Sequence, residues 1–143
     1  MMFNLDDCIA CITSRSAKKL ADCFEKRLNV YNITRTQWIA LYYISRNKTI
    51  TQRQLAGKMS LKEPTVVRLI DKMEVLGWVV RTTREDDKRI KLLELTEKGQ
   101  KVETEMREVA EKFRNDVISG ISAEELNSYK STLDKMLCNI KNG

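Results

Sequence analysis

Residues 63–99 have the sequence EPTVVRLIDKMEVLGWVVRTTREDDKRIKLLELTEKG. Because a residue before proline resists α geometry, Glu63 is expected to be a helix N-cap, with Pro64 at the first helical position. The apolar side chains that follow recur at helical spacing and predict one buried stripe, made of Val66, Leu69, Ile70 and Met73. Gly77 supplies the left-handed residue that commonly ends a helix.

The apolar period changes after this helix. Residues 78–84 and 90–95 are rich in valine, threonine, isoleucine and leucine, and they predict two strands. The charged segment 85–89 lies between them, so the pair is expected to be a β-hairpin with a charged tip. Thr96 is expected to begin the next helix.

Two further helices are predicted before Pro64. Thr34 and Gln37 form a capping box that opens a helix over residues 37–46, apolar nearly all round. Thr51 and Gln54 form another, which opens a short helix ending at Met59. Only a few residues separate that helix from Pro64, and two helices joined by so short a turn form a helix-turn-helix.

Long helices are predicted on both sides of this segment, over residues 5–29, 97–119 and 122–140, the last opened by a capping box at Ser122 and Glu125. Their apolar seams are narrow. One seam contains Ile9, Ile12, Leu20, Phe24 and Leu28, and another, expected to face inward, contains Leu126, Tyr129, Leu133, Met136, Leu137 and Ile140. A single copy would struggle to cover all of these faces, so we expect a homodimer, with a self-contained monomer as the alternative.

Length and composition indicate a single folded domain. The chain has 143 residues, of which 42% are hydrophobic and 32% charged, and its net charge is +6. The positive charge is uneven, since residues 99–143 hold 7 basic and 8 acidic side chains. The excess over residues 1–98 favours an anionic partner there. No apolar run would span a bilayer and no secretory signal is visible, so we expect a cytoplasmic protein.

The helix that follows Pro64 also has a polar stripe, formed by Thr65, Arg68 and Lys72. A short helix with a cationic outer stripe, followed by a hairpin with a cationic tip, suits duplex DNA. The helix fits the major groove, and the hairpin can reach the neighbouring backbone or minor groove. The ordinary alternative, that these are only solvated surface charges, is weaker because the opposite helix face is apolar. The complete set of expected DNA contacts is Thr51, Arg53, Lys62, Thr65, Arg68, Lys72, Arg81, Arg84, Lys88 and Arg89.

Several motifs in this chain resemble the MarR family of bacterial winged helix-turn-helix regulators. They include Thr51-Gln-Arg-Gln-Leu-Ala, the helix from Pro64 to Glu74, and Asp87-Lys88-Arg89 followed by Leu95-Thr96-x-x-Gly99. Their order and spacing match, so the resemblance covers essentially the whole chain. The fold that it implies is mainly α with a small β-hairpin wing: one domain over 1–143, with a winged helix-turn-helix lobe at 34–98 and a helical dimerisation region at 1–33 plus 99–143.

The resemblance also implies roles for particular residues. Thr65 and Arg68 would lie in the major groove, and Arg89 would approach the minor groove while Asp87 orients it. Arg81 would lie near the strand base. The terminal helices would build a two-fold dimer, so that two recognition helices meet a palindromic DNA site. Many members of the family bind small phenolic ligands, which makes the expected function that of a repressor released by an effector.

Candidates for the effector pocket are Arg15, Trp38 and Tyr42, although an aromatic stripe on a core helix more often serves packing. A small aromatic effector would suit them. No cofactor is expected. The chain contains no histidine, no glycine-rich phosphate loop, and no serine or cysteine beside a visible base, so it is not expected to be an enzyme.

The four cysteines leave a second interpretation open. Cys8 and Cys11 share a helical face, and some relatives that sense peroxide carry a reactive cysteine near the position of Cys11. A thiol-based oxidant sensor of the same fold is therefore an alternative, and Cys8, nearer the helix start, suits a lowered pKa better. Buried structural thiols are the simpler reading, and no metal site is expected. A third alternative, from another class, is a helical protein-interaction module that does not bind DNA.

Overall fold

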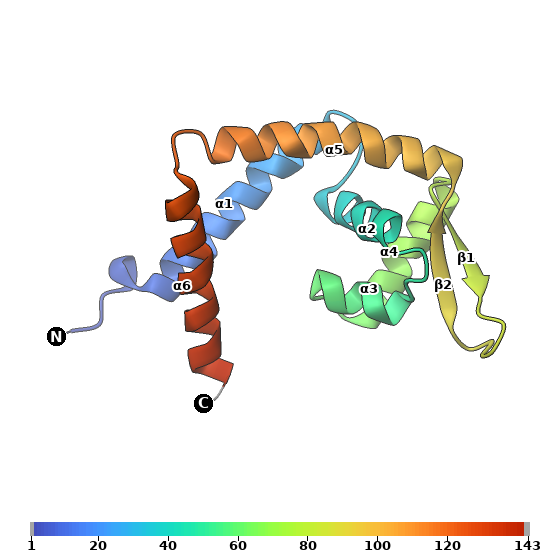
Figure 1. The fold of residues 1–143 in the computed structure, drawn as a ribbon, viewed down its shortest axis with the longest axis horizontal. Coiled ribbons are helices and arrows are strands. Elements are labelled where there is room, and N and C mark those ends of the chain that lie inside the picture. The colour runs from blue at the N-terminus through green and yellow to red at the C-terminus, as the bar shows by residue number, and fades with distance from the viewer. Residues whose placement is uncertain (1, 142–143) are drawn as a thin grey trace. The chain divides into compact units, whose positions relative to one another are not determined.

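The computed structural model describes residues 2–141, which form a 3-10 turn, six α-helices and one antiparallel hairpin (Figure 1). The chain divides into two compact units, the first ending at Glu111 and the second beginning at Lys112. The elements, in order, are η1 (Leu5–Asp7), α1 (Ile9–Asn29), α2 (Arg35–Arg46), α3 (Gln52–Met59), α4 (Glu63–Val75), β1 (Val79–Thr83), β2 (Lys91–Leu95), α5 (Glu97–Val117) and α6 (Ala123–Lys141). None of the helices in residues 2–141 combines the length and apolarity that a bilayer crossing needs.

Both capping boxes predicted in the first unit are complete. The Thr34 side chain accepts a hydrogen bond from the Gln37 N–H, and the Gln37 side chain accepts one from the Thr34 N–H. Thr51 and Gln54 form the same pair at the start of α3. The prediction that α2 begins at Gln37 is wrong by two residues, because Gln37 is the third helical residue after the cap at Thr34.

The turn between α3 and α4 is short. Ser60 adopts a left-handed conformation with φ of 55°, and the Leu61 N–H bonds to the Ala56 carbonyl at 3.0 Å. The N-cap of α4 is Lys62 rather than the predicted Glu63, which is the first helical residue. Pro64 therefore lies one position further in. That position is equally compatible with proline, because the N–H groups of the first turn have no partner within the helix.

The hairpin has the predicted pairing with slightly shorter strands. Val79 pairs with Leu95 and Thr83 with Lys91. The hairpin is also tied to the start of α3, because Leu93 N–H donates to the Ile50 carbonyl at 2.9 Å and Thr51 forms a β-bridge with Leu92. These contacts connect the wing directly to the helix-turn-helix.

The Leu-Thr-x-x-Gly motif joins β2 to α5. The Thr96 hydroxyl donates to the Gly77 carbonyl and accepts from the Gly99 N–H at 3.0 Å. Gly77 has a φ of 78°, the left-handed conformation that ends α4. A Cβ at Gly99 would lie 2.0 Å from the Trp78 carbonyl oxygen, so only glycine fits this crossing. The motif therefore fixes where the wing ends and α5 begins.

The core of the first unit is formed by apolar side chains from the helices α1 to α5, both included, and from the hairpin. Its largest fully buried members are Leu28, Leu41, Ile50, Leu55, Val66, Ile70, Met73, Val79, Leu93 and Met106. Three of the four residues predicted for the α4 stripe are buried, and Leu69 is half-buried. This core holds α4 with one face inward.

The prediction of one continuous helix over 5–29 is wrong at its beginning. Residues Leu5–Asp7 form a separate 3-10 turn capped by the Asn4 side chain, and Cys8 has extended backbone angles before α1 begins at Ile9. Asparagine favours such local capping over continuing a helix. Phe24 and Leu28 of α1 are buried, whereas Ile9 and Leu20 are exposed.

The second unit contains the end of α5 and all of α6. α5 ends at Val117, two residues earlier than predicted, and Gly120 has a φ of 77°. One half of the predicted capping box is present, since the Glu125 N–H donates to the Ser122 hydroxyl oxygen. The prediction that the α6 seam faces inward is wrong for one chain, because Tyr129, Leu137 and Ile140 are 58%, 61% and 74% exposed. The reason is that residues 112–141 offer this helix too little apolar surface of their own.

Candidate nucleic-acid interface

The two faces of α4 are sharply different. Val66, Ile70 and Met73 are fully buried, whereas the side chains of Thr65, Arg68 and Lys72 are exposed. Since residues three and four apart share a face of a helix, burying the first set turns the second set outward. The α4 surface thus offers a hydroxyl and two cations to a partner.

The candidates that precede this stripe lie near helix starts. Thr51 is the N-cap of α3 and is half-buried, and Arg53 is exposed in the first turn of that helix. Lys62 is the N-cap of α4 and is exposed. The first-turn N–H groups of a helix attract anions, so these positions suit contact with phosphate.

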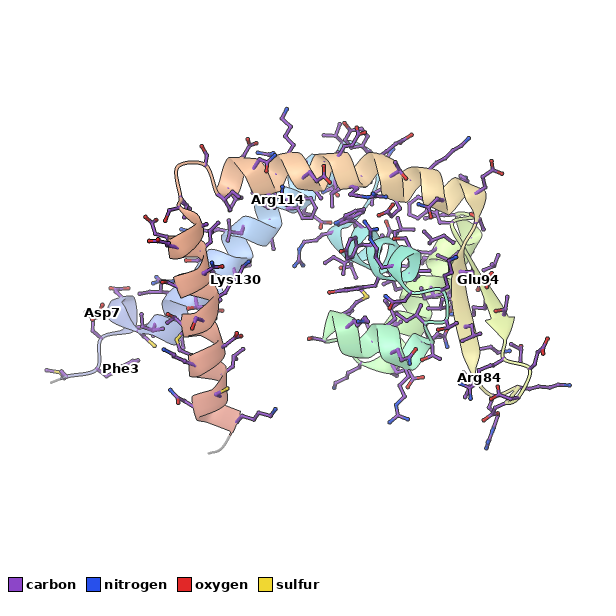
Figure 2. The ribbon with its side chains drawn as sticks, viewed as in Figure 1. Phe3, Asp7, Arg84, Glu94, Arg114 and Lys130 are labelled. Carbon is purple, nitrogen blue, oxygen red and sulfur yellow. The ribbon has the colours of Figure 1, made fainter. Side chains whose placement is uncertain are left out.

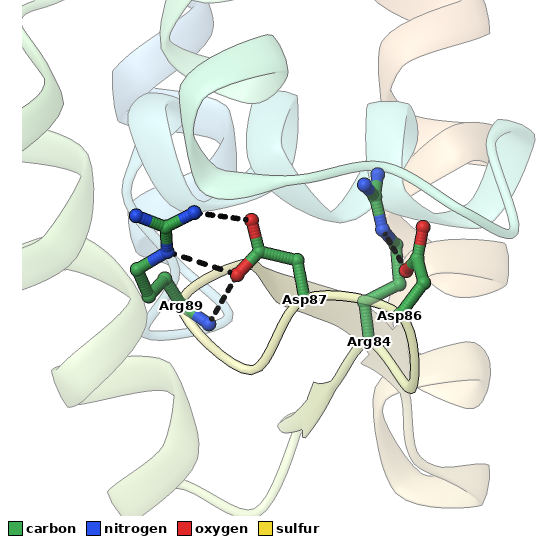
Figure 3. Close-up of polar contacts among 4 residues, drawn as sticks. All are labelled: Arg84, Asp86, Asp87 and Arg89. Carbon is green, nitrogen blue, oxygen red and sulfur yellow. Dashed lines mark hydrogen bonds and ion pairs between the residues drawn. The ribbon is translucent and has the colours of Figure 1, made fainter.

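Asp87 and Arg89 are paired at the tip of the hairpin, which we call the wing tip (residues 84–90) (Figure 3). Arg89 Nε lies 3.0 Å from Asp87 Oδ1, and Nη2 lies 3.2 Å from Oδ2. The Arg89 backbone N–H also donates to Asp87 Oδ1. Arg89 lowers the pKa of Asp87 through these bonds, so the carboxylate stays charged. The Arg89 side chain is 91% exposed, and the fork therefore holds a cation in open solvent.

The wing tip contains two further cations, Arg84 and Lys88. Figure 2 shows Arg84 near the tip of the hairpin, with Glu94 on the neighbouring strand closer to its base. Arg84 Nε lies 2.6 Å from Asp86 Oδ1, so a neighbouring carboxylate partly neutralises it. Lys88 is exposed.

Arg81 does not lie on the open surface where a DNA contact was predicted. Its side chain is 17% exposed and binds groups of α3 and α4. We therefore leave Arg81 out of the proposed contact set. The sequence pattern could not reveal this, because the alternation of a short strand does not say which partners lie across from it.

A cleft of about 230 Å³ brings the start of α3 and the wing tip together. It is lined by Thr51, Gln52, Arg53, Glu63, Arg89, Ile90 and Lys91. Two predicted cations therefore share one cleft, with Lys91 as a third that sequence reasoning missed. Lys91 donates to the Thr83 hydroxyl at 3.0 Å. Its signal was available, since it lies two residues after Arg89.

The predicted effector residues are only partly brought together. Trp38 is buried and lies against the exposed Tyr42, with ring centroids 6.0 Å apart. Arg46 lies over the Tyr42 ring at 5.3 Å. Arg15, by contrast, forms a 3.9 Å ion pair with Asp6 near the start of α1. Of the four pockets described on residues 2–141, none is lined by Arg15, Trp38 or Tyr42.

α5 contains a buried ion pair that the sequence pattern did not predict. Glu103 is fully buried, and its carboxylate accepts from Arg107 at 2.6 and 3.2 Å, which raises the pKa of Arg107. The i, i+4 spacing of glutamate and arginine is its only sequence signal. Because α5 carries many charges, that signal does not single out one pair.

The two candidate redox cysteines lie at the start of α1. Cys8 is the N-cap residue and Cys11 lies in the first turn, both half-exposed. The backbone N–H and thiol of Cys11 lower the pKa of Cys8, although the contact falls short of a capping hydrogen bond. The pKa of Cys11 is raised, chiefly by the Cys8 side chain. Cys8 is therefore the thiol of the pair that ionises more readily. Residues 2–141 contain no group of three or more cysteine, aspartate or glutamate side chains able to hold a metal ion.

Comparison with known proteins identifies the family. Residues 31–90 match the model described as MarR family. The crystal structure of transcriptional regulator PA3341 is similar, with a TM-score of 0.83 and 27% identity over 95% of this chain and all of the other. CouR from Rhodococcus jostii RHA1, solved with p-coumaroyl-CoA, has a TM-score of 0.83 and 25% identity over 94% of this chain and 95% of its own.

A third similar structure is MepR of S. aureus in a complex with DNA, with a TM-score of 0.85 and 23% identity over 92% of this chain and 98% of its own. That likeness speaks for the fold alone. These proteins thus share the flanking helices and the hairpin with this chain. The match to a family of transcription regulators is inconsistent with an enzyme and with a helical module that does not bind DNA. The chain belongs to the MarR family of winged helix-turn-helix, DNA-binding transcription regulators.

Proposed function

We propose that this chain acts as a homodimeric repressor that binds a palindromic DNA site through α4 and the wing, and that a small aromatic molecule releases it. The observation that carries the proposal is the contrast between the buried and exposed faces of α4, with an oriented Arg89 on the adjoining wing. An exposed helix face with a hydroxyl and two cations suits the major groove.

Each side chain has a proposed role in this complex. Thr65 and Arg68 meet base edges, because they lie in the first half of α4, where recognition helices contact bases. Lys72 meets a phosphate, and Arg89 enters the minor groove. Arg53 and Lys91 bind a phosphate at the cleft between α3 and the wing tip. The sugar-phosphate backbone of the duplex is contacted by the remaining residues, Thr51, Lys62, Arg84 and Lys88.

The dimer is supported by apolar side chains that one chain leaves in solvent. They occur at the beginning of the chain and along α6, and they include Phe3, Leu5, Ile9, Tyr129, Leu137 and Ile140. We propose that a second copy covers them, with residues 1–33 and 99–143 forming the dimerisation region and residues 34–98 the DNA-binding lobe. A two-fold dimer then presents two α4 helices to half-sites about one helical turn apart.

Release by a small molecule is supported by the relative CouR, whose structure contains p-coumaroyl-CoA, an aromatic acyl thioester. In this chain, Tyr42 is exposed and contacts Trp38, Tyr43 and Arg46, so its ring is available to stack on an aromatic effector. By linkage, the effector must bind more tightly to the spacing of α4 helices that does not fit DNA. Because its partner is bacterial DNA, we place the protein in the cytoplasm.

Replacing Arg68 with alanine tests the proposal. We expect operator binding to weaken by about 1–3 kcal/mol, with relaxed preference at one base position. Lys101→Ala is the matched control, because it removes an exposed cation of α5 outside the proposed contact set. Fluorescence anisotropy with operator and scrambled DNA, at two salt concentrations, gives both affinity and preference.

Unchanged binding by Arg68→Ala would contradict the role of α4. An equal loss on every sequence would reduce Arg68 to a phosphate contact. Wild-type binding that shows no steep fall with salt would contradict the whole electrostatic account.

Oxidation is a second candidate signal, because Cys8 lies beside Cys11 at the start of α1 and has a lowered pKa. Its thiolate would react with a peroxide first, and the effect would reach DNA through the dimerisation region. The reactivity of this thiol is the first quantity to measure.

A further inference from the structure

Among the described residues, the Arg81 side chain has more hydrogen-bond and ion-pair partners than the side chain of any residue proposed to contact DNA. All of these partners lie on α3 or α4, and none lies in the wing. Nε donates to Gln52 Oε1 at 2.7 Å, and Nη2 donates to the Val67 carbonyl oxygen at 3.0 Å. Nη1 lies 2.8 Å from Asp71 Oδ1 and also bonds to Glu74 Oε1. One guanidinium therefore joins β1 to α3 and to α4.

The planar fork of arginine suits this position. Its donors point in fixed directions, so satisfying several acceptors at once defines the orientation of each acceptor relative to the strand. Gln52 is the first residue of α3, whereas Val67, Asp71 and Glu74 lie along α4. The side chain thus fixes the rotation of α4 relative to the wing that follows it.

The same contacts have an electrostatic consequence. Asp71 and Glu74 flank Lys72 on α4, and their side chains are 58% and 38% exposed. Two carboxylates on a recognition helix would repel the phosphates that this helix approaches. Arg81 supplies a positive charge to both of them through its contacts with the face of α4 that carries Val67, Asp71 and Glu74. It therefore lowers the negative potential of α4 without occupying the DNA-facing surface.

We propose that Arg81 is a positioning residue for operator binding, which orients α4 against the wing and α3 and masks the acidic side chains of α4. This role rests on the proposed function of α4 as the recognition helix. It replaces the direct DNA contact predicted for Arg81.

The central variant is Arg81→Gln, in the full-length protein and at a temperature well below its unfolding midpoint. We expect operator affinity to fall about tenfold or more, since bonds to charged partners are lost. Lys101→Gln is the control, because it removes one exposed positive charge from α5. The decisive variant is Arg81→Gln combined with Glu74→Gln, whose net charge equals that of the wild type. It should recover part of the lost affinity, which loss of folding stability alone would not predict.

Hydrogen exchange without DNA tests the orienting role separately. Amides of residues 63–75 and 79–83 should exchange faster in Arg81→Gln than in Lys101→Gln. If exchange and operator affinity both match the control, the proposal is overturned. It is equally overturned if the double variant binds no better and the salt dependence falls by about one phosphate contact, because Arg81 would then touch DNA directly.

Failure of the proposed function gives a different pattern. Arg68→Ala would then bind like the wild type, or the wild type would prefer no sequence. The exchange measurement still decides the orienting role in that case, since faster exchange supports it and unchanged exchange overturns it.

Discussion

The DNA-binding lobe and the terminal helix α6 differ in how far their apolar side chains are buried within the chain. In α4, each residue of the inner face from Val66 to Met73 is buried or half-buried within the chain. In α6, the residues at helical spacing from Tyr129 to Ile140 are exposed or at most half-buried. Both segments are amphipathic helices of ordinary composition. The comparison teaches that amphipathicity predicts a buried face, but does not say whether the same chain or another supplies the cover.

The largest expected effect comes from charging the α6 seam. Leu137→Glu places a carboxylate where we propose a second copy packs, so the dimer should dissociate. Operator affinity should then fall roughly a hundredfold or more, because one subunit reaches only one half-site. Ser131→Glu, on another face of α6, is the control and should stay dimeric. Light scattering and operator titration measure the two results. A Leu137→Glu protein that stays dimeric with full affinity would place the interface elsewhere.

Deleting part of the lobe core should act on folding instead. Ile70→Ala leaves a cavity beneath α4 and is expected to cost about 2–5 kcal/mol of unfolding free energy. Val75→Ala lies on the same helix at an 88% exposed position and should change stability by less than about 0.5 kcal/mol. Urea unfolding followed by circular dichroism compares them. Equal losses in the two variants would contradict the one-sided burial of α4.

A smaller effect is expected at the wing tip. Arg89 lowers the pKa of Asp87, so their pairing is fully present above the ordinary aspartate pKa of 3.8 and is lost as the pH falls through the lowered value. Carboxyl NMR should show the Asp87 midpoint moving upward in Arg89→Gln. Arg84→Gln should move it less, because the charge of Arg84 lowers the pKa of Asp87 less than the hydrogen bonds from Arg89 do. An Asp87 midpoint that does not respond to Arg89→Gln would mean that the fork does not persist in solution.

The smallest change compares the two thiols of α1. At neutral pH, Cys8 should react with iodoacetamide faster than Cys11, because Cys11 lowers the pKa of Cys8 while its own is raised. A Cys23→Ser, Cys138→Ser background leaves only this pair to be read by mass spectrometry. In that background, Cys11→Ala should slow the alkylation of Cys8. Faster labelling of Cys11 would remove Cys8 from any sensing role.

Local signals predicted the lobe well. The capping boxes at Thr34 and Thr51, the left-handed Gly77 and the period change after it are properties of neighbouring residues, and the structure has all of them. The pairing of Asp87 with Arg89 is of the same kind, since only Lys88 lies between them. The errors at Glu63 and Gln37 are shifts of one or two positions at helix starts, where several residues can satisfy the same free N–H groups.

Contacts between distant segments could not be read in this way. Nothing in the alternation of β1 indicates that Arg81 turns toward Gln52 and Glu74, or that Glu103 is the one carboxylate of α5 that is fully buried. The extended backbone at Cys8, which divides the predicted first helix, is another such case. Each depends on which partner lies across space.

By itself, the sequence determined the succession of helices and strands, the cationic face of α4 and the family, because these follow from spacing along the chain. Tertiary structure alone decided that Arg53, Arg89 and Lys91 share a cleft, that Arg81 is turned inward, and that α6 is left uncovered. The physical reason is that burial and charge pairing depend on the distances between elements. Those distances are set by packing the whole core, whereas helix periodicity and capping are settled within a few residues.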